Sequence, residues 1–238
     1  MLEILDLVKH YKLGKAPPIR AVDGVTLTVE AGEFSVLYGP SGSGKSTLID
    51  LVAAAQKPDS GTVRFDGRDL AALSEAELDE YRLTELGVIG AQENLTEGAT
   101  VVEEASLRLD LTNTPDPEKV IVPLLISLGL GKRLRHRTQE LSMGERQRVM
   151  IAMALATKPK LVLADEPTGN LDTENSESVL RLLRDICDER GTAILLATHD
   201  LQAATFASHV HELRDGHLQD YRPGHILVPA DAVGRTDA

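Results

Sequence analysis

A glycine-rich segment near residue 40 contains groups that could hold phosphate. It fits the pattern G-x-x-x-x-G-K-S and runs into Thr47, with the residues Gly39, Pro40, Ser41, Gly42, Ser43, Gly44, Lys45 and Ser46. In this pattern, backbone amides ring the phosphates, the lysine reaches the terminal phosphates and the serine hydroxyl binds magnesium. A buried strand is expected over 34–38 and a helix over 47–52, as the pattern requires. We therefore predict a nucleotide site here, without a named reaction, because kinases and GTPases share the pattern.

Two neighbouring carboxylates follow a second apolar run. Asp165 and Glu166 come directly after 161–164, which has the composition of a buried strand. In phosphate-loop enzymes, a carboxylate at such a strand end holds magnesium, and another polar group positions the attacking water. We therefore assign Asp165 to the metal and Glu166 to the activation of water.

Two further polar residues follow apolar runs of the same kind. Gln92 comes after 87–89, and His199 comes after 192–197. The carboxyl ends of parallel strands share one edge of a sheet, so both side chains are expected beside the phosphates. There, Gln92 is predicted to be a magnesium ligand and a catalytic group, and His199 a catalytic group. Each residue alone is weak support, because a lone Gln or His at a strand end is more often an ordinary loop residue.

Strands and helices alternate along the chain, and this order predicts an α/β fold with a parallel sheet. Near the N-terminus, alternating apolar residues at 25–29 and 61–65 each meet a Gly-containing turn, which predicts antiparallel hairpins. We predict a P-loop NTPase (RecA-like) core that carries an N-terminal antiparallel β subdomain and an inserted α-helical subdomain.

One domain is expected over the whole chain, 1–238. Residues 1–92 are expected to form an antiparallel β subdomain and the first part of the core, and 93–140 a helical subdomain. Residues 141–216 would contain the signature and the rest of the core, and 217–238 a C-terminal strand and a tail. The apolar run 121–126 is short and contains a proline. A helix in the core of the subdomain is therefore favoured over a membrane segment.

Composition narrows the classes of function. The net charge of −12 opposes nucleic acid binding, because affinity for a phosphate backbone depends on Lys and Arg. The single cysteine, Cys187, excludes an internal disulfide and four-thiolate metal sites. The N-terminus lacks the pattern of a signal peptide, so we expect a cytoplasmic protein whose membrane role depends on a partner.

Four histidines near the C-terminus are interpreted as part of a solvated strand region and not as a metal site: His209, His211, His217 and His225.

Three further segments resemble the ATPase subunits of ABC transporters, and the resemblance covers nearly the whole chain. Tyr11 is placed like the aromatic residue that stacks on adenine in that family. The segment Leu141-Ser142-Met143-Gly144-Glu145 stands where the family has its signature Leu-Ser-Gly-Gly-Gln. The tract over 165–172, Asp-Glu-Pro-Thr-Gly-Asn-Leu-Asp, is similar to the branch that includes macrolide exporters, lipoprotein-release ATPases and the cell-division ATPase.

This resemblance implies an ATPase that uses ATP and Mg²⁺ and forms a head-to-tail homodimer, or a pair with a related ATPase subunit. Each ATP would lie between the phosphate loop of one subunit and the signature of the other, where Ser142, Gly144 and Glu145 would contact it. The family also implies integral-membrane permease subunits, and hence a peripheral position at the cytoplasmic face of the membrane. The ATP cycle would then power export or extraction of a substrate.

Two alternative functions share part of these motifs. A regulatory switch similar to the cell-division ATPase would use the same cycle to control an extracytoplasmic enzyme without transport, and the identity of the membrane partner would separate it from a transporter. A soluble member of the superfamily would act in DNA repair, translation or iron–sulfur assembly. The first two of these classes need long coiled coils, zinc modules or tandem cassettes, which this sequence lacks.

The signature departs from the family pattern at two positions. Met143 adds bulk and Glu145 adds negative charge near a phosphate site, which predicts reduced or regulated turnover unless the carboxylate is paired. We expect Arg146 or Arg148 to supply that pairing. The residues 93–98 also lack a Phe and a Pro that are usual in the branch, in a region that contacts the membrane subunit in relatives.

Overall fold

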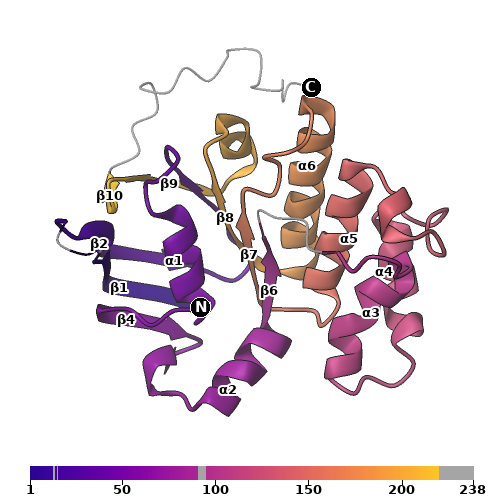
Figure 1. Ribbon diagram of the computed structural model, residues 1–238, viewed down its shortest axis with the longest axis horizontal. Helices are drawn as coiled ribbons and strands as arrows, with labels where there is room; N and C mark the ends of the chain where they lie inside the picture. Colours follow the sequence, from indigo (N-terminus) through magenta and orange to yellow (C-terminus); the bar gives the residue numbers. More distant parts are fainter. Residues whose placement is uncertain (13, 15, 91–94, 220–238) are drawn as a thin grey trace, which may run out of the picture.

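The structure, a computed structural model, describes residues 1–12, 14, 16–90 and 95–219 and contains two sheets with helices around them (Figure 1). The larger sheet has the strand order β10-β9-β3-β8-β7-β6. Its strands are β3 (Phe34–Tyr38), β6 (Leu86–Ile89), β7 (Leu161–Asp165), β8 (Ala193–Thr198), β9 (His209–Arg214) and β10 (His217–Gln219). All neighbouring pairs in this sheet are parallel except β9 with β10, in agreement with the predicted parallel sheet.

The central strands of this sheet are apolar on both faces because each face is covered. Successive residues of a strand point to opposite faces, so Val162 of β7 joins one hydrophobic core and Leu163 joins the other. The first core also contains residues of α5 (Met143–Leu155) and α6 (Thr173–Arg190), and the second contains residues of α1 (Lys45–Val52). Burial on both sides explains why nearly continuous apolar runs mark these strands in the sequence.

The smaller sheet is antiparallel and packs against the second core. Its strands, in the order β2-β1-β4-β5, are β1 (Leu2–Tyr11), β2 (Ile19–Val29), β4 (Ser60–Phe65) and β5 (Arg68–Asp69). The prediction of a hairpin after 25–29 is wrong. β2 pairs with the preceding strand β1, and the turn at Gly32 leads into β3 of the larger sheet. The local turn signal is overridden because Phe34–Tyr38 is a buried strand that pairs with β8 and β9. The hairpin expected after 61–65 is confirmed, since β4 pairs with β5.

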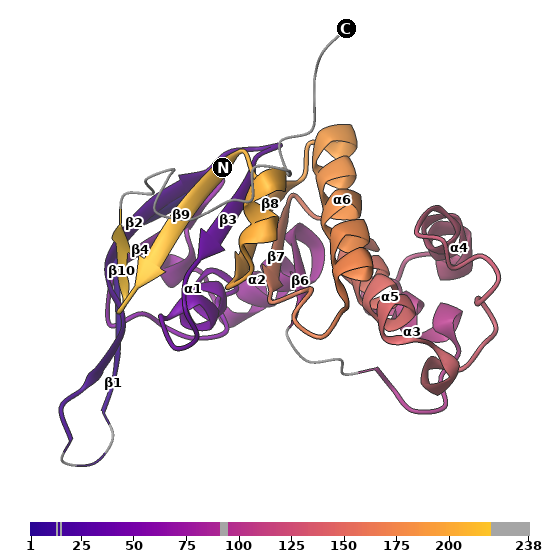
Figure 2. The same cartoon turned by 90° about the horizontal axis from the view of Figure 1, so that it is seen from above.

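Three helices pack together on the side away from the smaller sheet (Figures 1 and 2). α3 (Val101–Leu111) contacts both α4 (Pro117–Ser127) and α5. Pro117 opens α4 at a position where no amide donor is needed, while Pro123 lies within the helix. The apolar run 121–126 therefore belongs to a core helix, as expected. α3 and α4 both fall within 93–140, the segment assigned to the helical subdomain.

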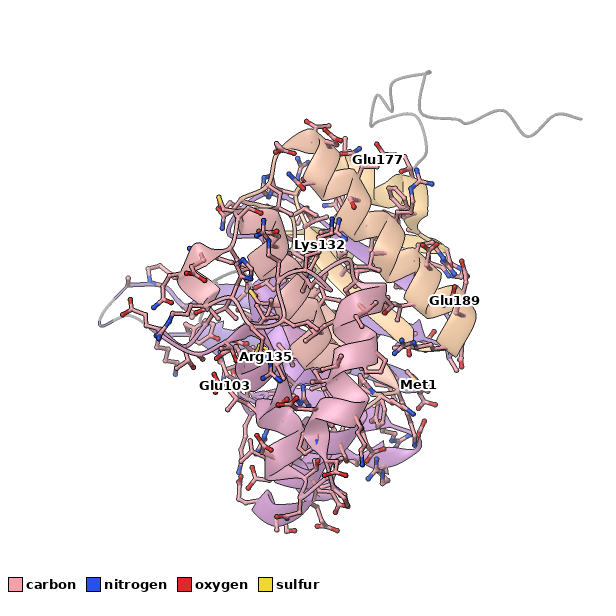
Figure 3. All side chains as sticks on the ribbon, turned by 90° about the vertical axis from the view of Figure 1, so that its right-hand side faces the viewer. Met1, Glu103, Lys132, Arg135, Glu177 and Glu189 are labelled. Carbon is pink, nitrogen blue, oxygen red and sulfur yellow. The ribbon has the colours of Figure 1, made fainter. Side chains whose placement is uncertain are left out.

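Short elements complete the fold. They are α2 (Glu75–Glu80), the π-helical turn η2 (Tyr81–Glu85), and the 3₁₀ turns η1 (Leu70–Ala72), η3 (Thr138–Glu140) and η4 (Leu201–Phe206). Figure 3 faces the helical side and shows Glu103 in the first turn of α3, with Glu177 and Glu189 on α6. Cys187 is buried on the inner face of α6. Within the described ranges, no helix has both the length and the apolar character that crossing a membrane requires.

Candidate functional site

The glycine-rich loop connects the buried strand β3 to the start of α1, as predicted. Its backbone conformation explains the last glycine: Gly44 has a φ of 107°, and a Cβ at this position would lie 1.8 Å from the carbonyl oxygen of Ala21. A side chain is therefore excluded at Gly44 by both conformation and contact. The first amides of α1 are left without helical partners, which suits an anion at this end.

Lys45, the first residue of α1, lies inside the loop. Its Nζ donates hydrogen bonds to the carbonyl oxygens of Gly39 (2.8 Å) and Pro40 (3.0 Å), and its side chain is only 6% exposed. The same Nζ is 3.7 Å from Oε1 of Glu166. The loop thus holds a buried cation directly beside the proposed water-activating carboxylate.

Ser46 and Asp165 form a small group of oxygen ligands beside this lysine. Burial raises the pKa of Asp165, against the opposing effect of a hydrogen bond with the Ser46 side chain. The Oδ1 atom of Asp165 is buried and has no hydrogen-bond partner among the described residues. Hydroxyl and carboxylate oxygens are the protein ligands that Mg²⁺ prefers, so the donor set and the unpartnered oxygen fit this ion.

Glu166 is held in a fixed orientation at the end of β7. Its φ of 48° places it in the left-handed region, which side chains other than glycine seldom adopt. Oε1 lies 2.9 Å from Nδ1 of His199, and Oε2 accepts a hydrogen bond from the Thr198 hydroxyl at 3.0 Å. The carboxylate is therefore aligned by two residues from the end of β8.

A cleft of about 640 Å³ joins these groups to Tyr11. It is lined by Tyr11, Ile19, Ala21, Pro40, Ser41, Gly42, Gly44, Lys45, Ser46, Thr47, Glu166 and His199. Ile19 was not identified as a site residue from the sequence. It lies opposite Tyr11 in the pairing of β1 with β2, and its side chain is 52% exposed. Gln92 lies outside the described residues. Glu166 and His199 also line a second cleft of about 450 Å³, together with Thr168 and Gly169.

The signature segment starts α5 and does not line the 640 Å³ cleft of its own chain. Ser142 caps this helix: its Oγ accepts from the Glu145 amide at 3.3 Å, and Glu145 Oε2 accepts from the Ser142 amide at 2.9 Å. A Cβ on Gly144 would lie 2.8 Å from Oδ1 of Asn175. The Nδ2 of Asn175 donates a hydrogen bond to Oδ1 of Asp172, at the start of α6. The glycine thus allows the starts of α5 and α6 to pack together.

The charge of Glu145 is compensated by a residue that the sequence did not indicate. Nε of Arg133 donates to Oε1 of Glu145 at 2.7 Å. The Ser142 amide and the Arg133 guanidinium together hold the pKa of Glu145 below its ordinary value. Arg146 and Arg148, which were expected to make this pair, instead donate to other groups: Arg146 to the carbonyl oxygen of Gln139, and Arg148 to the carbonyl oxygen of Leu128 and the hydroxyl of Ser178.

The histidines near the C-terminus lie on the predicted strands, with His209 and His211 on β9 and His217 on β10. His225 is not among the described residues. Across the described ranges, no group of three or more His, Cys, Asp or Glu side chains is arranged to hold a metal ion.

Comparisons with known proteins identify relatives over most of the chain. The sequence is 41% identical over 217 residues to the lipoprotein-releasing system ATP-binding protein LolD 2 of Caulobacter vibrioides, covering 90% of this chain and 94% of that protein. It is 42% identical over 224 residues to LolD of Psychrobacter arcticus, covering 93% and 99%. It is 39% identical over 220 residues to the macrolide export ATP-binding/permease protein MacB of Azoarcus sp., covering 92% of this chain and 33% of that protein.

The fold is also shared with solved structures. The dimeric structure of a bacterial ABC transporter cassette superposes with a TM-score of 0.83 at 33% identity, covering 92% of this chain and 97% of that one. The predicted α/β P-loop fold is therefore confirmed. The sequence pattern of the family described as ABC transporter matches residues 22–169. The chain belongs to the ABC transporter family, of which it is an ATP-binding cassette with ATPase function.

Proposed function

We propose that this cassette hydrolyses Mg²⁺-ATP as a head-to-tail dimer and drives a membrane partner. One observation carries the proposal: Glu166 Oε1 lies between the phosphate-loop lysine, at 3.7 Å, and His199, at 2.9 Å. A carboxylate at this point can polarise a water molecule for attack on the terminal phosphate, while Lys45 neutralises the charge that develops.

Other residues of the cleft have complementary roles. Ser46 and Asp165 would hold Mg²⁺, which offsets the negative charge of the phosphates and orients them. Nδ1 of His199 faces the Glu166 carboxylate and must carry a proton to donate to it, so Nε2 would donate to the terminal phosphate only when both ring nitrogens are protonated. Tyr11 provides an aromatic wall for the base. Gln92 is proposed to join the Mg²⁺ ligands.

A second copy is proposed because the signature lines neither of the two clefts formed by the described residues around Glu166. Ser142 and Met143 are exposed at the start of α5, a helix end suited to an anion. In a head-to-tail dimer, this end would meet the ATP held by the partner's phosphate loop. The second cleft, which shares Glu166 and His199 with the first, provides an adjoining surface for the partner. Segment 93–140 would act as the subdomain that carries the signature towards it.

The membrane partner is inferred from the relatives. Two of them are named as ATP-binding proteins of lipoprotein-releasing systems and are matched over 94% and 99% of their length. We propose a peripheral position at the cytoplasmic face of a membrane, on permease subunits, with a lipid-anchored protein as the cargo that is extracted.

Two substitutions test the proposed chemistry. Lys45→Ala should abolish binding of a fluorescent ATP analogue, while the matched surface change Lys119→Ala, on α4, should leave it intact.

Glu166→Gln should bind ATP but hydrolyse it about 10²- to 10⁴-fold more slowly. Glu177→Gln, on the exposed side of α6, is its control.

The dimer is tested with the slow variant. Size-exclusion chromatography of Glu166→Gln with Mg²⁺ and ATP should show a dimer, and omission of ATP should return the monomer. A monomer at every ATP concentration would contradict the proposal that two subunits share each ATP site. The phosphate site itself is tested separately, and unchanged ATP binding by Lys45→Ala would contradict it.

A further inference from the structure

The aromatic wall of the nucleotide cleft is anchored by a chain of hydrogen bonds. The Tyr11 hydroxyl donates to Oε1 of Gln56 at 2.6 Å, and Nε2 of Gln56 donates to Oδ2 of Asp50 at 3.0 Å. Asp50 lies on α1, the helix that starts at the phosphate loop, and Gln56 follows four residues after the end of that helix. The chain therefore connects the base side of the cleft to the phosphate side.

The direction of these hydrogen bonds follows from Asp50. An ionised carboxylate only accepts hydrogen bonds, so the amide of Gln56 must turn its NH₂ group towards Asp50. Its carbonyl oxygen then faces Tyr11, and the phenol hydroxyl must be the donor. One amide orientation satisfies both neighbours, which means that Asp50 also determines how Gln56 presents itself to the tyrosine.

Neighbouring contacts fasten the same part of β1 to the same loop. Nζ of Lys9 donates to the carbonyl oxygen of Lys57 at 2.7 Å, and the His10 amide donates to Oδ2 of Asp59 at 2.7 Å. The Asp59 amide in turn donates to the carbonyl oxygen of Val8 at 2.9 Å. The backbone next to Tyr11 is thus held by residues 57–59. Two contacts reach the tyrosine side chain: Nζ of Lys9 lies over the ring, 5.8 Å from its centroid, and Gln56 accepts from its hydroxyl.

We propose that Gln56 is a positioning residue for nucleotide binding: it holds the Tyr11 ring against the cleft and, through Asp50, ties it to the phosphate-loop helix. This inference rests on the proposed contact of Tyr11 with the base. A ring that is already fixed loses less conformational freedom when the base stacks on it. The contribution should therefore appear in affinity for the nucleotide and not in the rate of hydrolysis.

The test uses Gln56→Met, which keeps the side-chain length without its hydrogen bonds, and Tyr11→Phe, which keeps the ring without its hydroxyl. Each should raise the Kd of a fluorescent ATP analogue about threefold to tenfold, because a freed ring must be immobilised when the base stacks on it. The double variant should lose no more than either single variant, because both remove the same contact. At saturating ATP, kcat of Gln56→Met should be unchanged, because the positioning role acts on affinity.

Two controls separate positioning from general damage. Affinity for Mg²⁺-tripolyphosphate, measured by displacement of the analogue, should be unchanged by Gln56→Met because this ligand has no base. Tyr81→Phe removes another hydroxyl bond, to the carbonyl oxygen of Val52, and neither of these residues lines the cleft. It should lower the melting temperature without changing the Kd for ATP.

The outcomes distinguish this inference from the proposed function. If Tyr11→Ala weakens ATP binding but Gln56→Met does not, the positioning role is wrong and the base contact stands. Additive losses in the double variant, or equal losses for ATP and tripolyphosphate, would also overturn the positioning role. If Tyr11→Ala binds ATP normally, the proposed base contact itself fails.

Discussion

The carboxylate of Glu166 is shared among Lys45, Thr198 and His199, although its backbone lies in the left-handed region. Holding a residue other than glycine in that region costs about 1–3 kcal/mol, so the surrounding contacts must over-determine its position. The backbone amide of Glu166 also donates to Ala197 at 2.8 Å. Strain at this residue is therefore a cost of aiming the carboxylate at the cleft.

His199 gives the first test at this scale. Its imidazole is 62% exposed and uses Nδ1 for Glu166, so Nε2 can donate to the terminal phosphate when both ring nitrogens are protonated. We expect His199→Ala to lower kcat about 10²- to 10³-fold, as for loss of one donor to a developing charge. ATP binding should persist, since Lys45 is unchanged. His209→Ala, on β9, is the matched control, and an equal fall in kcat for both variants would contradict the role of His199.

The altered signature gives a second test. We predict that Met143→Gly with Glu145→Gln raises basal ATPase activity, and we expect most of this effect to come from Met143. Met143 is 48% exposed at the start of α5, while Glu145 is already paired with Arg133. Glu145→Gln alone should therefore change the rate little. Steady-state hydrolysis at saturating ATP decides the matter: an unchanged or lower rate in the double variant would show that the signature does not restrain turnover.

Among the elements, α3 packs its apolar face into the core and is also tied to η2 by the partly buried Arg108. Nη2 of Arg108 lies within hydrogen-bond distance of the carbonyl oxygens of Arg82, Leu83 and Leu86, around the end of η2. Burial lowers the pKa of Arg108. Arg108→Met should reduce the free energy of unfolding by about 1–3 kcal/mol, because carbonyl groups are left unpaired. Urea unfolding of this variant is compared with that of Arg135→Met, an exposed change, and equal stabilities would refute the prediction.

The capping boxes make several helix starts sensitive to acid. The side chain or amide of the cap residue, Ser74, Thr100 or Ser142, holds the pKa of Glu77, Glu103 or Glu145 below its ordinary value. A carboxylate with a lowered pKa stabilises the fold above its unfolded pKa, near 4.3, and loses this effect as the pH falls through the folded value.

Stability should therefore decline below about pH 4.3 as these carboxylates take up protons. Glu103→Gln keeps a hydrogen-bond acceptor at the start of α3 but cannot titrate, so its unfolding free energy should fall less steeply between pH 5 and pH 3. Urea unfolding across this range measures the slope. A slope identical to that of the native chain would show that the Glu103 cap is not among the titrating contacts.

The elements that could be predicted are those whose signal is local. β3 and β7 appear as apolar runs because both of their faces are buried, and the loop after β3 has the residue types that its backbone requires. Lys45 was predicted from the phosphate-loop pattern, and His199 was predicted to lie beside it because polar residues at the ends of parallel strands meet at one edge; both line the same cleft. Residues that act by tertiary contact, such as Gln56, Arg108 and Arg133, carry no pattern of their own.

At the scale of the whole molecule, the site is proposed to be completed by other subunits. The signature lies outside the cleft of its own chain, so the isolated subunit is predicted to have low basal ATPase activity. Activity should rise when a membrane partner positions the helical part against the core. Co-purification with untagged neighbours from the same operon, followed by ATPase assays with and without them, tests this. No stimulation by any co-purified membrane protein would contradict the assignment.

Because Cys187 is buried, the native chain should react little with thiol-labelling reagents. Its side chain is 1% exposed, burial raises its pKa, and reagents attack thiolates in preference to thiols. As the chain has no other cysteine, Lys132→Cys and Glu177→Cys would each create one accessible attachment point, at two of the positions labelled in Figure 3. A fluorophore pair on these positions would report, without background, how the loop before the signature moves against α6 as ATP is bound and hydrolysed.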